Sequence, residues 1–315
     1  MLGKTANAIF WMFRYLERAE NTARLLEAGF RMALTRGGDA AGEEWRSVIN
    51  TLGMDEAYEA KHESYSGPEA CDFILRDRDN PECVMAMVEN ARNNARLSRT
   101  SITTEVWEAV NEAWMTLKGL LTRQVREANL SHVLYSIRRE ATQVRGATYG
   151  SMLRNDIFHF ARAGTFVERA DNTARILDVK YHLLLPSLAH VGSRLDAGQW
   201  ESILRALSAR RAHREVIHAG KPDASGIAEL LILDPRFPRS LAYCYDTLSE
   251  NLSALAAIHG QESQCNSLMR EAETKLSETS IDDIFDRGLH EFLVDFISSN
   301  RAIANAIAED YRFTH

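Results

Sequence analysis

The chain has 315 residues, of which 45% are hydrophobic and 26% are charged, and its formal net charge is −7. This length allows one large domain or two ordinary ones with a sizeable core. The acidic balance argues against a nucleic-acid-binding protein, which usually carries a basic surface. The four cysteines form no C-x-x-C pair, which argues against a zinc site or a disulfide framework and favours a reducing cytoplasm. They are Cys71, Cys83, Cys244 and Cys265.

The N-terminal segment has an apolar run, "ANAIFWMF", that ends early at Arg14, Glu17 and Arg18. It is short for a signal peptide and lacks a small-residue cleavage site after it. No stretch approaches the 18 or more apolar residues of a membrane span. We therefore predict a cytoplasmic protein without membrane segments.

The first predicted element is a long helix that ends in the glycine-rich stretch "TRGGDAAG". Its apolar residues recur at alternating steps of three and four, which places them on one helical face. They are Ile9, Met12, Leu16, Ala19, Ala23, Leu26 and Phe30. Helical periodicity continues through most of the chain, and the only strand candidates, "DFILRD" and "ELLILD", are too short and isolated to make a sheet. The predicted fold class is all-α.

Two segments far apart in the chain are nearly the same. Residues 15–26 read "YLERAENTARLL" and residues 166–177 read "FVERADNTARIL", with eight of twelve positions identical and an offset of 166 − 15 = 151. Pro81 and Pro238 also align, at an offset of 157, within "DFILRDRDNPECV" and "ELLILDPRFPRSL". Such periodicity indicates a tandem duplication. We predict two pseudo-repeated helical bundles, residues 1–150 and 151–315, joined in one domain because no Pro/Gly/Ser-rich linker separates them.

The repeated segment also carries a polar stripe. Helical spacing places Arg14, Glu17, Asn21 and Arg24 on one side of the first helix. Thr165 replaces the first arginine in the second copy, and "VENARNNARL" (88–97) holds a third copy of the E-x-x-x-N-x-x-R spacing. The candidate site residues, with the arginines that follow two of the glutamates, are Arg14, Glu17, Arg18, Asn21, Arg24, Glu89, Asn93, Arg96, Glu168, Arg169, Asn172 and Arg175.

Three interpretations of the stripe are open. It forms a solvated helix face, a buried Glu–Asn–Arg network between helices, or a pocket for an anionic or amide-bearing ligand with Glu17 or Glu168 as acid/base. If the duplicated helices share one buried cluster, Arg24→Ala and Arg175→Ala should each destabilise the protein, and their effects should be non-additive.

Histidine spacing raises one further candidate. Glu59/His62 and Glu215/His218 are E-x-x-H pairs at an offset of 156. A ferritin-like dimetal site uses two such motifs with two further glutamates. With 10 histidines and many glutamates in the chain, about one such pair is expected by chance. We predict no tightly bound metal and no cofactor, and we interpret the cysteines as small buried hydrophobic residues.

Taken together, "RYLERAENTARLL", "RADNTARIL", "ENAR", "LILDPRFPRS" and a final helix ending near "YRF" resemble the alpha-E domain family, a bacterial all-helical family named for its Glu-Arg motif. In this chain the pairs are Glu17–Arg18 and Glu168–Arg169, whereas Asn90 follows Glu89 in the middle copy. Members of the family tend to be encoded beside, or fused to, circularly permuted ATP-grasp proteins and transglutaminase-like cysteine-peptidase proteins. The resemblance implies a role in making, transferring or cutting peptide-like amide bonds.

Three functional hypotheses follow. The leading one is an accessory protein that binds an ATP-grasp or other amide-processing partner and holds a peptide or acyl substrate at the polar stripe. The alternatives are an amide-bond ligase or transferase component that uses Glu17 or Glu168, and a purely structural interaction module. The direction in which the stripes point distinguishes a pocket from a dry helix contact.

Overall fold

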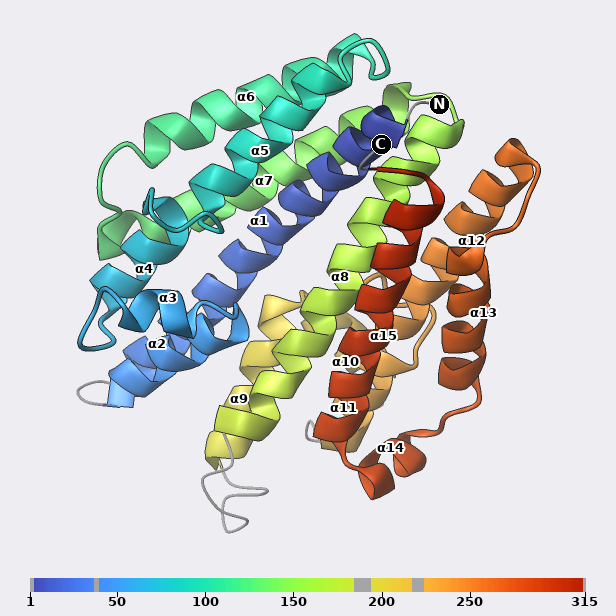
Figure 1. Ribbon diagram of the computed structural model, residues 1–315. Coiled ribbons are helices and arrows are strands. Elements are labelled where there is room, and N and C mark those ends of the chain that lie inside the picture. The colour runs from blue at the N-terminus through green and yellow to red at the C-terminus, as the bar shows by residue number, and fades with distance from the viewer. Residues whose placement is uncertain (1–2, 37–39, 184–193, 217–223, 314–315) are drawn as a thin grey trace. The chain divides into compact units, whose positions relative to one another are not determined.

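The computed structural model describes residues 3–36, 40–183, 194–216 and 224–313 (Figure 1). Within these ranges all regular secondary structure is helical, with 15 helices and no strand, so the predicted all-α class is confirmed. The chain forms two compact units. The N-terminal unit is Trp11–Leu153, and the C-terminal unit combines Met1–Phe10 with Arg154–His315.

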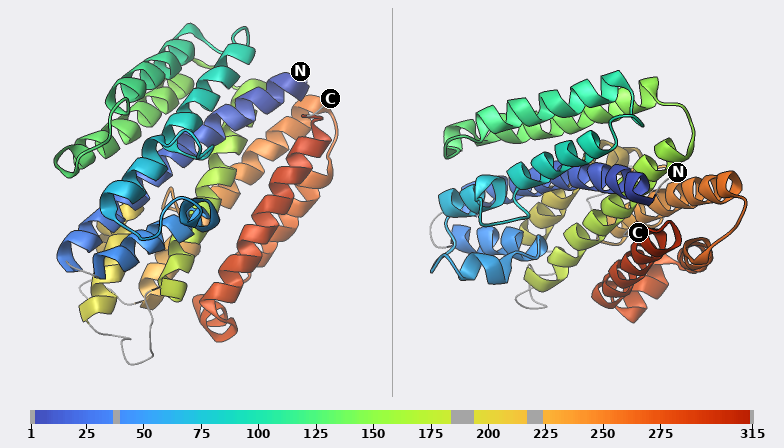
Figure 2. Two further views of the ribbon diagram at one scale, coloured as in Figure 1. Left: turned by 60° about the vertical axis from the view of Figure 1, so that its left-hand side comes forward. Right: turned by 45° about the horizontal axis from the view of Figure 1, so that its top comes forward.

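The N-terminal unit contains seven helices within the described ranges. They are α1 (Gly3–Arg36), whose first residues belong to the other unit, α2 (Ala40–Thr51), α3 (Asp55–Glu59), α4 (Gly67–Arg76), α5 (Val84–Leu97), α6 (Thr104–Leu120) and α7 (Glu127–Ser151). Helices α5, α6 and α7 lie side by side in succession (Figures 1 and 2). Helix α6 begins where the Thr103 hydroxyl accepts a hydrogen bond from the Val106 amide at 3.3 Å, which satisfies one of the amides at the helix start.

The first helix forms as its apolar periodicity predicts. Six of the seven residues on its predicted apolar face are buried, and Phe30, near the end of the helix, is partly exposed. The helix ends at Arg36, inside the predicted glycine-rich stop. Gly29 permits close packing on α2, because a Cβ atom there would lie 2.3 Å from Val48 Cγ2.

The C-terminal unit is organised around a four-helix bundle. Helix α8 (Asp156–Leu183) packs on α12 (Leu241–His259) and α15 (Leu289–Asp310), and α13 (Gln264–Ser277) packs on both of these (Figure 2). The shorter helices are α9 (Arg194–Ala206), α10 (Arg210–Val216), α11 (Ala224–Ile232) and α14 (Ile281–Arg287). Helix α12 ends at Gly260, whose φ of 73° is the left-handed conformation that glycine adopts without strain.

One close approach in the C-terminal unit depends on glycine. Gly164 lies in the interior of α8, where a Cβ atom would come within 2.3 Å of the Phe10 carbonyl oxygen. The rings of Phe10 and Phe160 both contact Phe313, with centroid distances of 5.4 and 6.1 Å. The start of the chain is therefore packed against α8 and the C-terminal residues of the same unit.

The two aligned turns have the same local structure. The strand candidates that precede them are helical, in α4 and α11. In each turn an aspartate carboxylate accepts a hydrogen bond from the amide two residues on, and its carbonyl accepts one from the amide three residues on. The backbone amide of the N-cap residue of the next helix donates to the carbonyl of the residue three positions after the aspartate. The residues are Asp77, Asn80 and Cys83 in one turn and Asp234, Phe237 and Ser240 in the other. Duplication of the complete halves stays a prediction, which superposition of residues 1–145 on 151–300 tests through the equivalence of Glu17 and Glu168.

In the described part of the chain, no helix combines the length and the apolar character that crossing a membrane requires.

Candidate functional site

The first polar stripe forms a buried ion-pair cluster between α1 and α7. Glu17 and Glu20 are 1% and 0% exposed. Arg145 of α7 donates from Nη1 to Glu17 Oε2 at 3.2 Å and also contacts Glu20 Oε2. Arg24 donates from Nη2 to Glu20 Oε1 at 2.7 Å. Two buried carboxylates therefore face two guanidinium groups, and this balance is what buried charges require.

The other residues of the first stripe have different surroundings. Asn21 is 1% exposed, whereas the Arg14 guanidinium lies 4.4 Å from the centroid of the Trp11 ring and is partly exposed. Arg18 is directed to the turn before α5, where its Nη1 lies 3.5 Å from Glu82 Oε1. The residues of the first stripe therefore differ in solvent exposure. Its glutamate and asparagine are buried, whereas its arginines are partly exposed.

The second stripe lies on α8 and is less enclosed. Glu168 and Arg169 are 4% and 8% exposed, while Asn172 is partly exposed. Arg175 pairs with Asp171 on the same helix through Nε at 2.6 Å, and its side chain is 37% exposed. Asp171 stands where the first copy has Glu20, and it is also partly exposed, at 22%. The outer part of this stripe is therefore a partly exposed ion pair within one helix.

The arginine of each Glu-Arg pair reaches the aligned turn of its own unit. Arg18 approaches Glu82 in the first turn. Arg169 donates from Nη1 to the Pro238 carbonyl at 3.3 Å in the second turn, and Thr173, one helical turn further along α8, donates to the Arg239 carbonyl at 2.8 Å. The two Glu-Arg arginines therefore share a structural role, because each connects its long helix to the turn that starts the next bundle helix.

The third copy of the spacing is a solvated surface. Glu89, Asn93 and Arg96 of α5 are all exposed, in contrast to Glu17 and Asn21. The same three residue types at the same spacing thus occupy opposite environments, and α5 contributes none of them to a buried network. This copy is therefore a solvated helix face, whereas the centre of the first copy is a buried network.

The contrast between the stripes leads to a stability prediction. Removing Arg24 by Arg24→Ala should lower the free energy of unfolding by about 1–3 kcal/mol, because the fully buried Glu20 loses a charge-assisted hydrogen bond. Arg175→Ala should cost about 0.5 kcal/mol or less, since its pair is largely solvated. Urea denaturation of both variants and of the double variant measures this. Non-additivity beyond about 0.5 kcal/mol would show that the two stripes are coupled.

The two E-x-x-H pairs have other partners. Glu59 accepts a hydrogen bond from the Tyr65 hydroxyl at 2.9 Å, and His62 stacks on Tyr58 with ring centroids 4.5 Å apart. Glu215 pairs with Arg211 at 2.9 Å, while His218 lies outside the described residues. Among the residues that the structure describes, no group of three or more His, Cys, Asp or Glu side chains is arranged to hold a metal ion.

The cysteines are all buried and unbridged, as small hydrophobic side chains are. Burial raises the pKa of the Cys71 thiol to about 12, with smaller contributions from Asp72 and Glu127. Burial likewise raises the pKa of Cys265 to about 12. A thiol with such a pKa is protonated at neutral pH and is a poor nucleophile.

Cys71 should therefore resist alkylation in the folded protein. At pH 8 a pKa of about 12 leaves roughly one thiolate in ten thousand thiols. We expect iodoacetamide at this pH to leave Cys71 unmodified in the native protein and to modify it fully after unfolding in guanidinium chloride. Peptide mapping by mass spectrometry measures both states. Rapid native labelling would instead identify an activated thiol.

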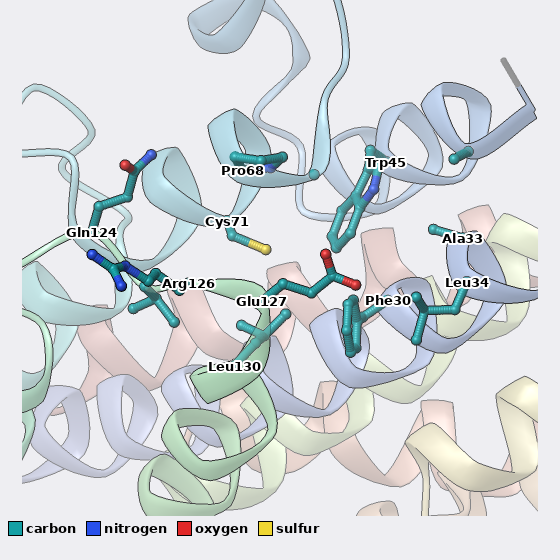
Figure 3. A pocket seen from close by; sticks show the side chains of 13 residues that line it. Phe30, Ala33, Leu34, Trp45, Pro68, Cys71, Gln124, Arg126, Glu127 and Leu130 are labelled. Atoms are coloured by element: carbon teal, nitrogen blue, oxygen red, sulfur yellow. The ribbon is translucent and has the colours of Figure 1, made fainter. Parts of the chain in front are cut away.

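A pocket of about 410 Å³ opens in the N-terminal unit, between the end of α1, the starts of α2 and α4, and the segment that leads into α7 (Figure 3). Its volume lies in the usual range for small-ligand sites. Its walls are mostly apolar, with the Cys71 thiol among them, and charged groups come from Arg126 and Glu127. The lining residues are Phe30, Ala33, Leu34, Ala41, Trp45, Gly67, Pro68, Cys71, Gln124, Val125, Arg126, Glu127 and Leu130.

Sequence reasoning missed this pocket. None of its lining residues is among the twelve candidates of the polar stripe, and they come from four segments spread over residues 30–130. Each segment carries only an ordinary amphipathic or turn pattern, so no local motif marks the site. Of the lining residues, the sequence analysis singled out Cys71, as a buried cysteine.

The fold and the Glu-Arg pairs define an all-helical domain in which the two Glu-Arg arginines reach the turns that start the next helices. A family model described as "a predicted alpha-helical domain with a conserved ER motif", the Alpha-E family, matches residues 1–311. The chain belongs to the Alpha-E family.

The curated relatives that match are longer proteins. Uncharacterized protein Mb2597 of Mycobacterium bovis and uncharacterized protein MT2643 of Mycobacterium tuberculosis (strain CDC 1551) are each 21% identical, over 96% of this chain and 35% of the relative. Uncharacterized protein Rv2567 of M. tuberculosis (strain H37Rv) is 20% identical with the same coverage. The chain thus spans about a third of the length of these relatives. No solved structure gives a significant match.

Proposed function

We propose that this chain is an accessory module that holds a peptide-like or acyl substrate for an amide-bond-processing partner. The pocket of about 410 Å³ in the N-terminal unit carries the proposal. Apolar walls with a few polar groups at the edge are typical of a site that binds an organic ligand. This pocket replaces the polar stripe as the place where the substrate is held.

Glu17, one of the two glutamates considered for catalysis, and the Cys71 thiol of the pocket support holding rather than chemistry. Arg145 and Arg24 neutralise the carboxylates of Glu17 and Glu20 inside the first cluster. The Cys71 thiol, which lines the pocket, is protonated because burial raises its pKa to about 12. A general base or a nucleophile must be within hydrogen-bond reach of the reacting group and in the correct protonation state. At the pocket, the carboxylates of the cluster are not within reach, and the Cys71 thiol is not in the reactive protonation state.

The length of the relatives supports an accessory role. In those proteins the matching region is about a third of the polypeptide, so it functions as one part of a larger protein. The proposed partners, a circularly permuted ATP-grasp protein and a transglutaminase-like protein, rest on the family resemblance alone. We propose a cytoplasmic location because an ATP-dependent partner needs cytoplasmic nucleotide and because the four cysteines are unbridged.

Reconstitution tests the proposal. The chain is mixed with a circularly permuted ATP-grasp protein, and ADP release is measured with peptide and amino-acid substrates. We expect the rate to depend on the chain and to fall sharply with Ala41→Leu, which adds bulk to the lining of the pocket. The matched control is Glu89→Gln on the exposed face of α5, and it should leave the rate unchanged.

The other hypotheses give different results in the same assay. Amide-bond formation or cleavage by the chain alone, lost in Glu17→Gln or Glu168→Gln, would identify an enzyme in its own right. A rate that depends on the chain but is insensitive to filling the pocket would identify a structural interaction module. Either result would overturn the proposed substrate-holding role.

A further inference from the structure

The pocket of the N-terminal unit contains a carboxylate for which the described residues supply no counter-ion. Glu127 is the first residue of α7, and Figure 3 shows its carboxylate directed into the pocket, toward the space between the rings of Trp45 and Phe30. It makes no hydrogen bond or ion pair with any residue that the structure describes. Glu127 is solvent-exposed, so its carboxylate is accessible to a ligand in the pocket.

We propose that this pocket binds the ammonium group of an amino-acid residue with an apolar side chain, with Glu127 as the partner of the ammonium and the aromatic and aliphatic walls around the side chain. The inference rests on the proposed substrate-holding function and specifies its substrate class. The same chemistry occurs in a free amino-acid derivative and at the N-terminus of a peptide.

Arg126 and Glu127 both line the pocket, and Figure 3 shows the Arg126 guanidinium beside Gln124, away from the Glu127 carboxylate. Near the carboxylate, the pocket therefore favours a cation over an anion. The carboxylate of Glu127 repels anionic ligands and attracts cationic ones. The rings of Trp45 and Phe30 add cation–π attraction, which grows as the cation loses water. Glu127 also acts on the interior of the pocket, because it contributes to the raised pKa of Cys71.

The remaining wall suits an apolar side chain. Pro68, Cys71 and Leu130 line the pocket beside Glu127 (Figure 3), and Cys71 and Leu130 are almost completely buried. A branched or aromatic side chain of the ligand that enters beside these groups is itself removed from water, which stabilises a complex. Glycine derivatives lack this contribution and should bind more weakly.

The position of Glu127 at the start of α7 does not by itself explain why its carboxylate is directed into the pocket. An acid in the first turn stabilises any helix by interaction with the helix dipole. Glu105 fulfils this role in the first turn of α6 and is not among the residues that line this pocket. Glu105 is therefore a matched control, with the same charge, exposure and helix-terminal position.

A second hollow beside the pocket provides space for the rest of a longer ligand. Gln124, Val125 and Arg126 line the pocket on one side and a more polar hollow of about 640 Å³ on the other. Arg123 and His132 also line this hollow. The amides and the C-terminal carboxylate of a short peptide would find hydrogen-bond donors there. A peptide should therefore bind more tightly than a single residue if peptides are the natural ligand.

Isothermal titration calorimetry of the complete chain with four probes tests the inference. They are L-phenylalaninamide, its N-acetyl derivative, glycinamide and the peptide Phe-Gly-Gly. We expect L-phenylalaninamide to bind, and the N-acetyl derivative and glycinamide to bind at least about tenfold more weakly, since each lacks one of the two recognised groups. Tighter binding of Phe-Gly-Gly indicates a peptide ligand, and equal or weaker binding indicates a free amino-acid derivative; both support the inference.

Variants identify the recognising group. Glu127→Gln should weaken L-phenylalaninamide binding about five- to tenfold, and added salt should weaken binding to the wild type but not to this variant. Glu105→Gln should bind as the wild type does. Thermal melts near that of the wild type for both variants ensure that binding, not folding, is compared.

Two results would overturn the inference. If N-acetyl-L-phenylalaninamide binds as well as the free amine and Glu127→Gln has no effect, the occupant is a neutral apolar group. The inference then fails while the proposed function stands, provided that Ala41→Leu still abolishes partner-dependent ADP release. If no probe binds the folded chain at millimolar concentration, the ammonium site is absent.

Discussion

Replacement of Arg145 by alanine should lower the free energy of unfolding on the order of 3–5 kcal/mol. Arg145 is the residue of α7 that contacts both Glu17 and Glu20, and its side chain is 22% exposed while theirs are 1% and 0% exposed. Without it, Glu17 and Glu20 each lose their ion pair with α7. A buried carboxylate that loses an ion-pair partner stays desolvated without an equivalent interaction in its place.

Urea denaturation followed by circular dichroism measures this effect. Arg145→Lys should recover only part of the loss, because an ammonium lacks the second terminal guanidinium nitrogen, which in Arg145 donates to the Thr142 hydroxyl at 3.1 Å. The control is Arg270→Ala, since the pair between Arg270 and Glu262 is exposed on both sides and should leave the midpoint near that of the wild type. A wild-type midpoint for Arg145→Ala would mean that the cluster is solvated and that its burial does not govern stability.

Gly164→Ala should destabilise the protein by about 1–3 kcal/mol or more, although alanine is the better helix former. The added Cβ atom would lie 2.3 Å from the Phe10 carbonyl oxygen, a backbone atom that cannot rotate away. Helix α8 and the start of α1 must then separate, which disturbs the contacts of Phe10 with Phe313. Local propensity and tertiary packing therefore predict opposite signs, and packing should prevail.

Gly146→Ala is the matched control for this prediction. Gly146 lies in the interior of α7, is exposed, and has open space where a Cβ atom would stand. The substitution should stabilise the protein by about 0.5–1 kcal/mol through helix propensity alone. Thermal and urea unfolding of both variants should give shifts of opposite sign. Stabilisation by Gly164→Ala would contradict the close approach of α1 to α8.

The polar stripe illustrates how far sequence reasoning reaches. The spacing of Glu17, Asn21 and Arg24 predicts one helix face, and the structure places Glu17 and Asn21 of that face in a buried environment. The identical spacing at Glu89, Asn93 and Arg96 is solvent-exposed on α5. Spacing determines which side chains share a face, but the neighbours that cover this face come from elsewhere in the chain. The partner of Glu17, Arg145, is 128 residues away and belongs to no motif.

By itself the amino-acid sequence determined the helical class, the course of α1 and its glycine-rich end, because helical periodicity and turn chemistry act over a few residues. The motifs in the sequence likewise indicated the Alpha-E family. The tertiary structure alone decided which copy of the stripe is buried, how closely Gly164 approaches Phe10, and where a pocket lies. The pocket combines Phe30, Trp45, Cys71 and Glu127 from separate helices. A cavity and an ion-pair cluster are properties of packed surfaces, so they arise only when segments distant in sequence come together.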